Sequence, residues 1–177
     1  MLQNNEISLT RASIQQKKAL YDISRHTFYE SYGPPLNTER NIQHYISEHL
    51  TLEKLASELQ NPNVYYFLLT YSKEVIGYLK LNIGTAQTEH LGNSALEIER
   101  IYIKKEFQGN QLGQLLIEKA KHLGRQLNKH FVWLGVWDQN RRAIQFYKRA
   151  GFIPFSTHTF TLGDDVQTDI MMKLMLA

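Results

Sequence analysis

The sequence predicts a mixed α/β domain, an α+β arrangement in which helices flank a sheet with both antiparallel and parallel strand pairs. Residues 64–83 show two apolar runs joined by a short polar turn, which is typical of an antiparallel hairpin. Residues 96–137 show the order strand, helix, strand, which favours a right-handed βαβ unit. The chain has 177 residues, of which 42% are hydrophobic, so we expect one domain over residues 1–177.

The first third of the chain is predicted to be mainly helical. Ile7–Arg11 is a short first strand, and a helix follows from Ile14 to about Glu30. The Gly33-Pro34-Pro35 segment ends this helix, because proline removes a backbone donor and fixes φ. Apolar residues at helical spacing predict a second helical region over about 38–60, either continuous or split. Residues 61–63, Asn-Pro-Asn, form a turn.

The remaining two thirds alternate between strands and helices. Two strands, 64–71 and 75–83, are followed by a polar loop at 84–95 and a strand at 96–103. A helix is predicted from Leu112 to about Leu127, then a strand at 131–137 that is apolar on both faces. A helix at 140–150 stops at Gly151. The last predicted strands cover 152–160 and 167–175.

Composition excludes several classes of site. The chain has no cysteine, which rules out disulfides, thiolate zinc sites and cysteine nucleophiles. The seven histidines show no ligand spacing, so we expect no metal. The net charge of +3 fits either a solvated surface or attraction to an anionic ligand, and basic residues occur in pairs rather than blocks, which argues against nucleic-acid binding. With no secretory or membrane-spanning pattern, we expect a cytoplasmic protein.

The segment Phe107–Leu116, FQGNQLGQLL, lies where a predicted strand leads into a predicted helix. The first backbone N–H groups of a helix lack partners inside the helix, and the helix dipole favours negative charge there. Gly109 and Gly113 allow the backbone to approach a ligand closely. The segment is neither a Walker A loop nor a G-x-G-x-x-G motif. Taken alone, it fits a plain turn as well as a diphosphate site.

Three further groups of residues carry possible chemistry. Asn140, Ala143, Ile144 and Tyr147 share one face of a predicted helix, where the tyrosine hydroxyl is either a proton donor to a leaving group or part of the core. On the strand before the loop, Glu97 and its neighbour two residues on, Glu99, share a face. These carboxylates either raise one another's pKa and supply a general base or form a solvated face. A third group consists of three carboxylates, Asp164, Asp165 and Asp169. These either attract a cationic substrate or belong to an Asp-rich turn.

The order of these features, from about Ala95 to Phe152, resembles the GNAT N-acetyltransferase superfamily. That superfamily has a strand, a Q/R-x-x-G-x-G/A loop and a helix, then a strand and an N-x-x-A-x-x-x-Y helix ending in Gly-Phe. Here the loop is Gln108–Gly113, and the second helix carries Asn140, Ala143 and Tyr147 before Gly151-Phe152. The segments LEIERIYI, WLGVWDQN, AIQFYKRAGF and GDDVQTDIMM look similar to the PaiA-type spermine/spermidine acetyltransferases of bacteria.

The resemblance implies a mostly antiparallel sheet of six to seven strands, with a central parallel pair splayed to take acetyl-CoA. It implies that the pyrophosphate lies on the loop amides and the pantetheine on the strand backbone. It also implies that Asn140 touches the pantetheine, that Tyr147 protonates the departing thiolate and that Glu97, or secondly Glu99, is the base. The implied cofactor-binding residues are Ile101, Tyr102, Ile103, Gln108, Gly109, Asn110, Gln111, Leu112, Gly113, Asn140 and Tyr147. Gln111 departs from the family pattern, which has glycine at this position.

The same resemblance implies an amine acceptor, with a polyamine as the first choice. A protein N-terminus or lysine, or another small amine, is the alternative, and an acyl-CoA-binding regulator with little catalysis is a third possibility. Without cysteine, transfer is expected by direct attack of the amine in a ternary complex. The expected acceptor surface comprises Tyr29, Tyr32, Glu97, Glu99, Asp164, Asp165 and Asp169. Either a monomer or a homodimer is expected.

Overall fold

The computed structural model describes residues 6–162 and 165–177. These residues form two compact units. The first comprises the described residues up to Lys80 together with Arg100–Gly113, and the second comprises Leu81–Glu99 and the described residues from Gln114 onward. Strand β4 (Ala95–Ile103) contributes residues to both units. The predicted single domain over residues 1–177 stays a prediction.

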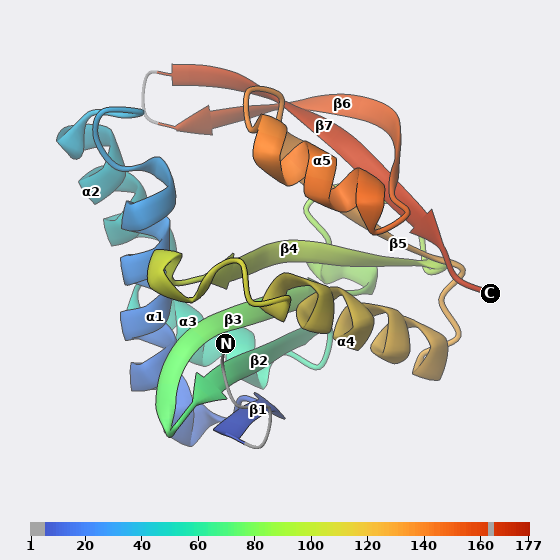
Figure 1. The fold of residues 1–177 in the computed structure, drawn as a ribbon, viewed down its shortest axis with the longest axis horizontal. Coiled ribbons are helices and arrows are strands. Elements are labelled where there is room, and N and C mark those ends of the chain that lie inside the picture. Colours follow the sequence, from blue (N-terminus) through green and yellow to red (C-terminus); the bar gives the residue numbers. More distant parts are fainter. Residues whose placement is uncertain (1–5, 163–164) are drawn as a thin grey trace. The chain divides into compact units, whose positions relative to one another are not determined.

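Within the described part of the chain, seven strands form a sheet in the order β1-β2-β3-β4-β5-β7-β6 (Figure 1). β4 and β5 run parallel, whereas β1 pairs with β2, β5 with β7 and β6 with β7 in antiparallel fashion. The predicted fold class, a mostly antiparallel mixed sheet with one parallel pair, is confirmed. The strands are β1 (Ile7–Arg11), β2 (Val64–Tyr71), β3 (Glu74–Asn82), β4, β5 (Phe131–Trp137), β6 (Ile153–Leu162) and β7 (Asp165–Met175).

The first unit contains the three N-terminal helices. A 3-10 turn at Ile14–Gln16 precedes α1 (Lys17–Tyr32), so the helix predicted from Ile14 begins three residues later and ends two residues later. The helical region predicted over 38–60 is split into α2 (Glu39–His49) and α3 (Leu52–Gln60). The split has a local cause, because the Thr51 side chain accepts a hydrogen bond from Lys54 N and so caps a new helix.

The second unit is built around β5, which lies between β4 and β7. A Cβ added at Gly124 of α4 (Leu112–Gln126) would meet Val132 of β5, and one added at Gly151, which follows α5 (Arg141–Arg149), would meet Leu174 of β7. Val132 and Leu174 are register partners, so they share a face of the sheet. Figure 1 shows both helices on this side of β5 and β7.

The opposite face of β5 is covered by the loop of residues 84–92. The segment 84–95, predicted as an irregular polar loop, opens with a 3-10 turn at Gly84–Ala86. The Trp133 indole Nε1 donates a hydrogen bond of 2.8 Å to Gln87 Oε1 in this loop. Glu97 is the register partner of Trp133 on β4, so its side chain points to the same face. Among the described helices, none is long and apolar enough to cross a membrane.

Candidate active site

The carboxylates of Glu97 and Glu99 lie on one face of β4, as the alternating sequence predicts. Glu97 is 3% exposed and Glu99 is half-buried. The alternative of a solvated strand face therefore does not describe Glu97. A carboxylate buried to this extent needs hydrogen-bond donors around it, since burial without partners is costly.

Neighbouring residues supply those donors. The backbone N–H of Thr88 donates to Glu97 Oε2 at 2.9 Å, and the Thr88 hydroxyl donates to Oε1 of the same carboxylate. The side-chain amide of Asn82, on β3, donates from Nδ2 to Glu97 Oε2 at 3.0 Å and to Glu99 Oε2 at 2.6 Å. One amide nitrogen thus bridges the two glutamates.

The surroundings of Glu97 shift its titration. Burial raises the pKa of Glu97 above its ordinary value, and the nearby Glu99 carboxylate raises this pKa further. The hydrogen bonds from Thr88 and Asn82 act against this shift because they stabilise the ionised carboxylate. The pKa of a general base is more useful when it lies closer to the working pH, so the direction of the shift suits such a role.

Beside Glu97, the two parallel strands stop pairing. The register between β4 and β5 covers Ala95–Glu97 and Phe131–Trp133, and it does not extend to Ile98 and Glu99, which belong to the same unit as β5. β5 itself continues to Trp137 and stays paired with β7 along its whole length. The parallel ladder therefore ends at the residue that carries the buried carboxylate.

Tyr147 and Asn140 come from α5, on the other face of β5. Tyr147 is 8% exposed, and its ring packs edge-on against Phe146 and Phe152. Asn140 is the N-cap of α5, where its Oδ1 accepts a hydrogen bond of 3.1 Å from Ala143 N. The predicted acid and the predicted base thus approach the β4–β5 pair from opposite faces of the sheet.

The predicted diphosphate loop lies in the first unit. Gly109 has φ of 84° and Gln111 has φ of 60°, so both adopt the left-handed conformation. A residue with a Cβ is disfavoured in this conformation, so Gln111 occupies a position better suited to glycine. Gln108 and Gln111 are exposed, and Leu112, the first residue of α4, is buried. The turn thus presents its backbone just before the N-terminus of a helix.

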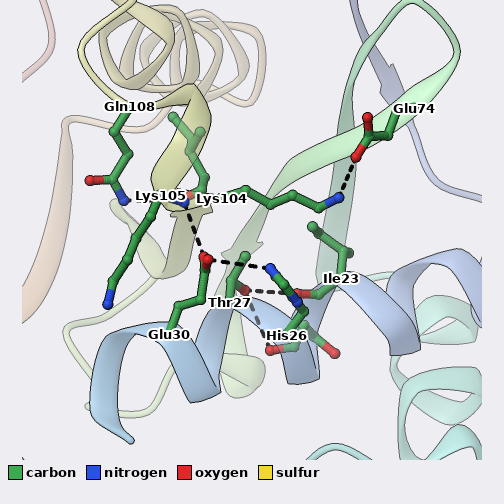
Figure 2. Close-up of polar contacts among 10 residues, drawn as sticks. Ile23, His26, Thr27, Glu30, Glu74, Lys104, Lys105 and Gln108 are labelled. Atoms are coloured by element: carbon green, nitrogen blue, oxygen red, sulfur yellow. Dashed lines mark hydrogen bonds and ion pairs between the residues drawn. The ribbon is translucent and has the colours of Figure 1, made fainter.

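Contacts with α1 and β3 fix the start of this loop (Figure 2). Glu30 of α1 accepts a hydrogen bond of 3.0 Å from the backbone N–H of Lys105, and Lys104 pairs with Glu74. Gln108 Nε2 donates to the carbonyl of Ile103 at 3.0 Å, which closes the turn on the end of β4. These contacts hold the backbone before Gly109, where the Lys105 amide donates to Glu30 and the Gln108 amide donates to the carbonyl of Lys105.

Two predicted residues of the first unit contact one another. The Tyr102 hydroxyl of β4 donates to the Tyr32 hydroxyl of α1 at 3.2 Å, and burial raises the pKa of Tyr102 well above its ordinary value. Tyr29 is exposed, and its hydroxyl donates to Glu39 at 2.8 Å. The structure therefore brings Tyr32 together with the strand predicted to bind the cofactor and joins Tyr29 to α2.

The predicted acidic residues near the C-terminus are described in part. Asp169 Oδ2 lies 3.5 Å from His158 Nε2, and Glu89 Oε1 lies 3.5 Å from His158 Nδ1. Burial raises the pKa of Asp169, Asp138 raises it further, and His158 lowers it. Asp164 lies outside the described residues, and of Asp165 the structure describes the backbone at the start of β7 but not the side chain.

Sequence reasoning missed Asn82 and Thr88. A signal for Asn82 was present, because it is a polar residue near the end of an otherwise apolar strand. Nothing in the sequence distinguishes Thr88 from its polar neighbours in the loop. Within residues 6–162 and 165–177, no three histidine, aspartate or glutamate side chains are grouped so as to hold a metal ion.

Comparisons with known proteins extend this description. The family model of the acetyltransferase (GNAT) family matches residues 17–152. An uncharacterized N-acetyltransferase in the pepI 3′ region of Lactobacillus delbrueckii subsp. lactis is 38% identical over 170 residues, which cover 96% of this chain and 98% of that protein. The spermidine N(1)-acetyltransferase of Thermoplasma acidophilum is 25% identical over 150 residues, which cover 82% and 88%.

A solved structure shows the same fold. It is the PaiA N-acetyltransferase from Thermoplasma acidophilum in complex with coenzyme A, with a TM-score of 0.76 and 23% sequence identity. The match covers 94% of this chain and 97% of that one.

Proposed function

The chain belongs to the acetyltransferase (GNAT) family, and from that premise we propose that it transfers an acetyl group from acetyl-CoA to a primary amine, with a polyamine as the favoured acceptor. The predicted resemblance to this family and the predicted enzyme class, an acetyl-CoA-dependent N-acetyltransferase, are confirmed at the level of the family. The identity of the acceptor and the roles of individual residues are proposed.

The loop geometry fits a bound diphosphate. Left-handed backbone at Gly109 and Gln111 turns the chain just before a helix N-terminus, where N–H groups and the helix dipole favour an anion. In the proposal, the amides of Gln108–Gly113 hold the pyrophosphate of acetyl-CoA, and the strand backbone at Ile101–Ile103 pairs with the pantetheine. Asn140 contacts the pantetheine arm. The thioester of acetyl-CoA supplies an activated acyl group.

The chain's own residues take the first proton from the amine and give one to the sulfur. A carboxylate of the Glu97–Glu99 pair takes a proton from the acceptor ammonium, which frees the nitrogen lone pair for attack on the carbonyl carbon. A C–N bond forms and the C–S bond breaks. Tyr147 gives its hydroxyl proton to the departing sulfur. The attacking nitrogen releases its second proton to water and Tyr147 regains a proton from water, so the products are a neutral amide and the CoA thiol. Glu97 and Tyr147 lie on opposite faces of the sheet. This supports separate roles for them, with the carboxylate accepting a proton from the amine on one face and the tyrosine donating a proton to the sulfur on the other.

One observation carries the proposal above all others. The buried Glu97 carboxylate, hydrogen-bonded through Asn82 to Glu99, lies where the parallel ladder of β4 and β5 ends. Two adjacent carboxylates attract a cationic amine and supply a base for it. Asp169 and the spermidine acetyltransferase relative favour a polyamine over a neutral acceptor.

The sequence also predicts alternative acceptors, namely a protein N-terminus or lysine or another small amine. A further alternative is a regulator that binds acyl-CoA with little turnover. A cytoplasmic location and a monomeric or homodimeric state also stay predictions. Acceptor choice depends on side chains rather than on the fold.

An acceptor screen tests the proposal directly. Purified protein is incubated with acetyl-CoA and spermidine, spermine, small monoamines or peptides with free N-termini, and free thiol is followed over time. We expect the highest kcat/KM with a polyamine. Faster turnover of a peptide would favour the protein acceptor. Stabilisation by CoA, about 2.7 kcal/mol at 100 times Kd, without thiol release from any acceptor would favour the regulator.

A further inference from the structure

A chain of hydrogen bonds connects β5 to the Glu97 carboxylate through the loop of residues 84–92. Trp133 Nε1 donates to Gln87 Oε1, and Gln87 Nε2 donates to the carbonyls of Gly84 and Gly92 at 3.2 and 3.1 Å. Gln87 therefore both attaches the loop to β5 and closes it upon itself. The next residue is Thr88, whose N–H and hydroxyl donate to Glu97.

The second support for Glu97 comes from β3. Asn82 is completely buried, and its Nδ2 lies within hydrogen-bond distance of both Glu97 Oε2 and Glu99 Oε2. The orientation of this amide is fixed by charge, because the reverse orientation would place Oδ1 against two carboxylate oxygens. Both oxygens of Glu97 thus have donors, so the carboxylate plane cannot rotate without losing a hydrogen bond.

We propose that Asn82 and Thr88 are positioning residues for acetyl transfer, which together hold the Glu97 carboxylate ionised and in one orientation beside Glu99. The inference rests on the proposed function, in which a carboxylate of this pair accepts the proton of the acceptor amine. Neither residue touches the acceptor or acetyl-CoA in this proposal. Each acts through the glutamates.

The need for two such residues follows from burial. A carboxylate that is 3% exposed is driven toward its neutral form by lost hydration, and the negative charge of Glu99 drives it in the same direction. The neighbours from the other packed elements, Asn82 of β3, Thr88 of the loop and Trp133 of β5, are neutral. Donors to the carboxylate oxygens therefore provide the stabilisation of the charge that the base requires.

A matched pair of substitutions tests the role of the Thr88 hydroxyl. Thr88→Val keeps the shape of the side chain and the backbone N–H but removes the hydroxyl, whereas Thr88→Ser keeps the hydroxyl. We expect Thr88→Val to lower kcat about 10- to 100-fold, the effect of one lost hydrogen bond to a charged group, with the KM for acetyl-CoA nearly unchanged. The acid limb of the kcat/KM profile should move to higher pH by about one unit. Thr88→Ser keeps the hydroxyl, so it should retain most of the wild-type kcat.

Asn82 is tested by its coupling to the glutamate pair. Asn82→Leu keeps similar volume and removes the bridging donor, so its acid limb should also move to higher pH. Glu99→Gln removes a negative charge, so its acid limb should move to lower pH. If Asn82 acts through both glutamates, Asn82→Leu should lower kcat/KM by a smaller factor in the Glu99→Gln background than in the wild type. An equal loss of kcat/KM in the two backgrounds, or pH profiles whose acid limbs do not move, would overturn the proposal for Asn82.

A measurement independent of turnover separates this inference from the proposed function. Urea unfolding of Thr88→Val and Thr88→Ser is compared from pH 4 to pH 8. Because the hydroxyl stabilises the ionised carboxylate, the stability difference should grow as the pH rises through the pKa of Glu97. A difference that does not change with pH overturns the positioning role. If the difference grows with pH while no amine is acetylated, the positioning role stands and the proposed acetyl transfer fails.

Discussion

The indole nitrogen of Trp133 donates a hydrogen bond of 2.8 Å to Gln87 Oε1, and both side chains are buried. Trp133 lies in the middle of β5 and pairs in register with Glu97 on one side and Lys173 on the other. Gln87 lies in the loop that covers this face. This side-chain pair attaches the loop to β5, next to the hydrogen bonds from Thr88 to Glu97.

Gln87→Leu should destabilise the protein by about 1–3 kcal/mol, because it leaves the buried indole N–H without an acceptor and removes the bonds that close the loop. Urea unfolding followed by tryptophan fluorescence measures this loss, and the emission of Trp133 should also change in the folded state. Gln126→Leu, at an exposed position of α4, is the control and should stay within about 0.5 kcal/mol of the wild type. Equal stability of Gln87→Leu and wild type would show that the loop does not depend on this pair.

Gln111→Gly should stabilise the diphosphate loop. Gln111 has φ of 60°, a conformation that costs a residue with a Cβ about 1–2 kcal/mol, although glycine returns part of this in chain entropy. We expect a gain of up to about 1 kcal/mol in unfolding free energy and CoA binding at least as tight as in the wild type, measured by calorimetry. Gln114→Gly, inside α4, should instead lose about 1 kcal/mol. A loss in both variants would contradict the strain assigned to Gln111.

Glu97→Gln should be more stable than the wild type at neutral pH and inactive. The pKa of Glu97 is raised in the folded state, so the stability it contributes is present in full below its ordinary pKa and is lost as the pH rises through the raised pKa. A glutamine stays neutral, and the Thr88 hydroxyl can accept from its amide. The stability advantage of Glu97→Gln should therefore grow between about pH 4 and pH 8 in urea unfolding. An advantage independent of pH would contradict the raised pKa.

Asp169→Asn should weaken the use of a polyamine more than that of a monoamine. Asp169 is largely buried, so its charge acts on a second ammonium group with less screening than a surface charge would. We expect the KM for spermidine to rise about 3- to 10-fold, which is on the order of 1 kcal/mol, with kcat little changed. The KM for a small monoamine should stay the same. Asp22→Asn, at an exposed position of α1, is the control. Equal effects on both amines would remove Asp169 from the acceptor site.

The sequence predicts the order and type of the main elements because their signals are local. Apolar spacing, the caps and the glycine after α5 all lie within a few residues of the elements they define. The alternation of Glu97 and Glu99 also follows from the strand period alone, so their common face is predicted correctly. The resemblance to the family pattern adds the loop and Tyr147, because the motifs that carry it are short runs of neighbouring residues.

The support of the glutamates is not predictable in this way. Asn82 contacts Glu97 across 15 residues of chain and Thr88 contacts it across 9, so both contacts depend on strand register and on the path of a loop. The left-handed conformation of Gln111 is equally hidden, because glutamine carries no local preference for it. These contacts join segments that are distant in the sequence, and only the folded chain brings such segments together.

Tyr147→Phe should lower kcat about 100-fold or more, since it removes the hydroxyl proposed to protonate the departing sulfur. The ring is buried against Phe146 and Phe152, and phenylalanine keeps these ring contacts, so the variant should fold and the KM for acetyl-CoA should change little. Free thiol release measures the rate, and calorimetry measures CoA binding. Tyr65→Phe, on β2, is the matched control and should retain wild-type turnover. Unchanged turnover in Tyr147→Phe would remove this tyrosine from the acid role and leave the sulfur to be protonated by water.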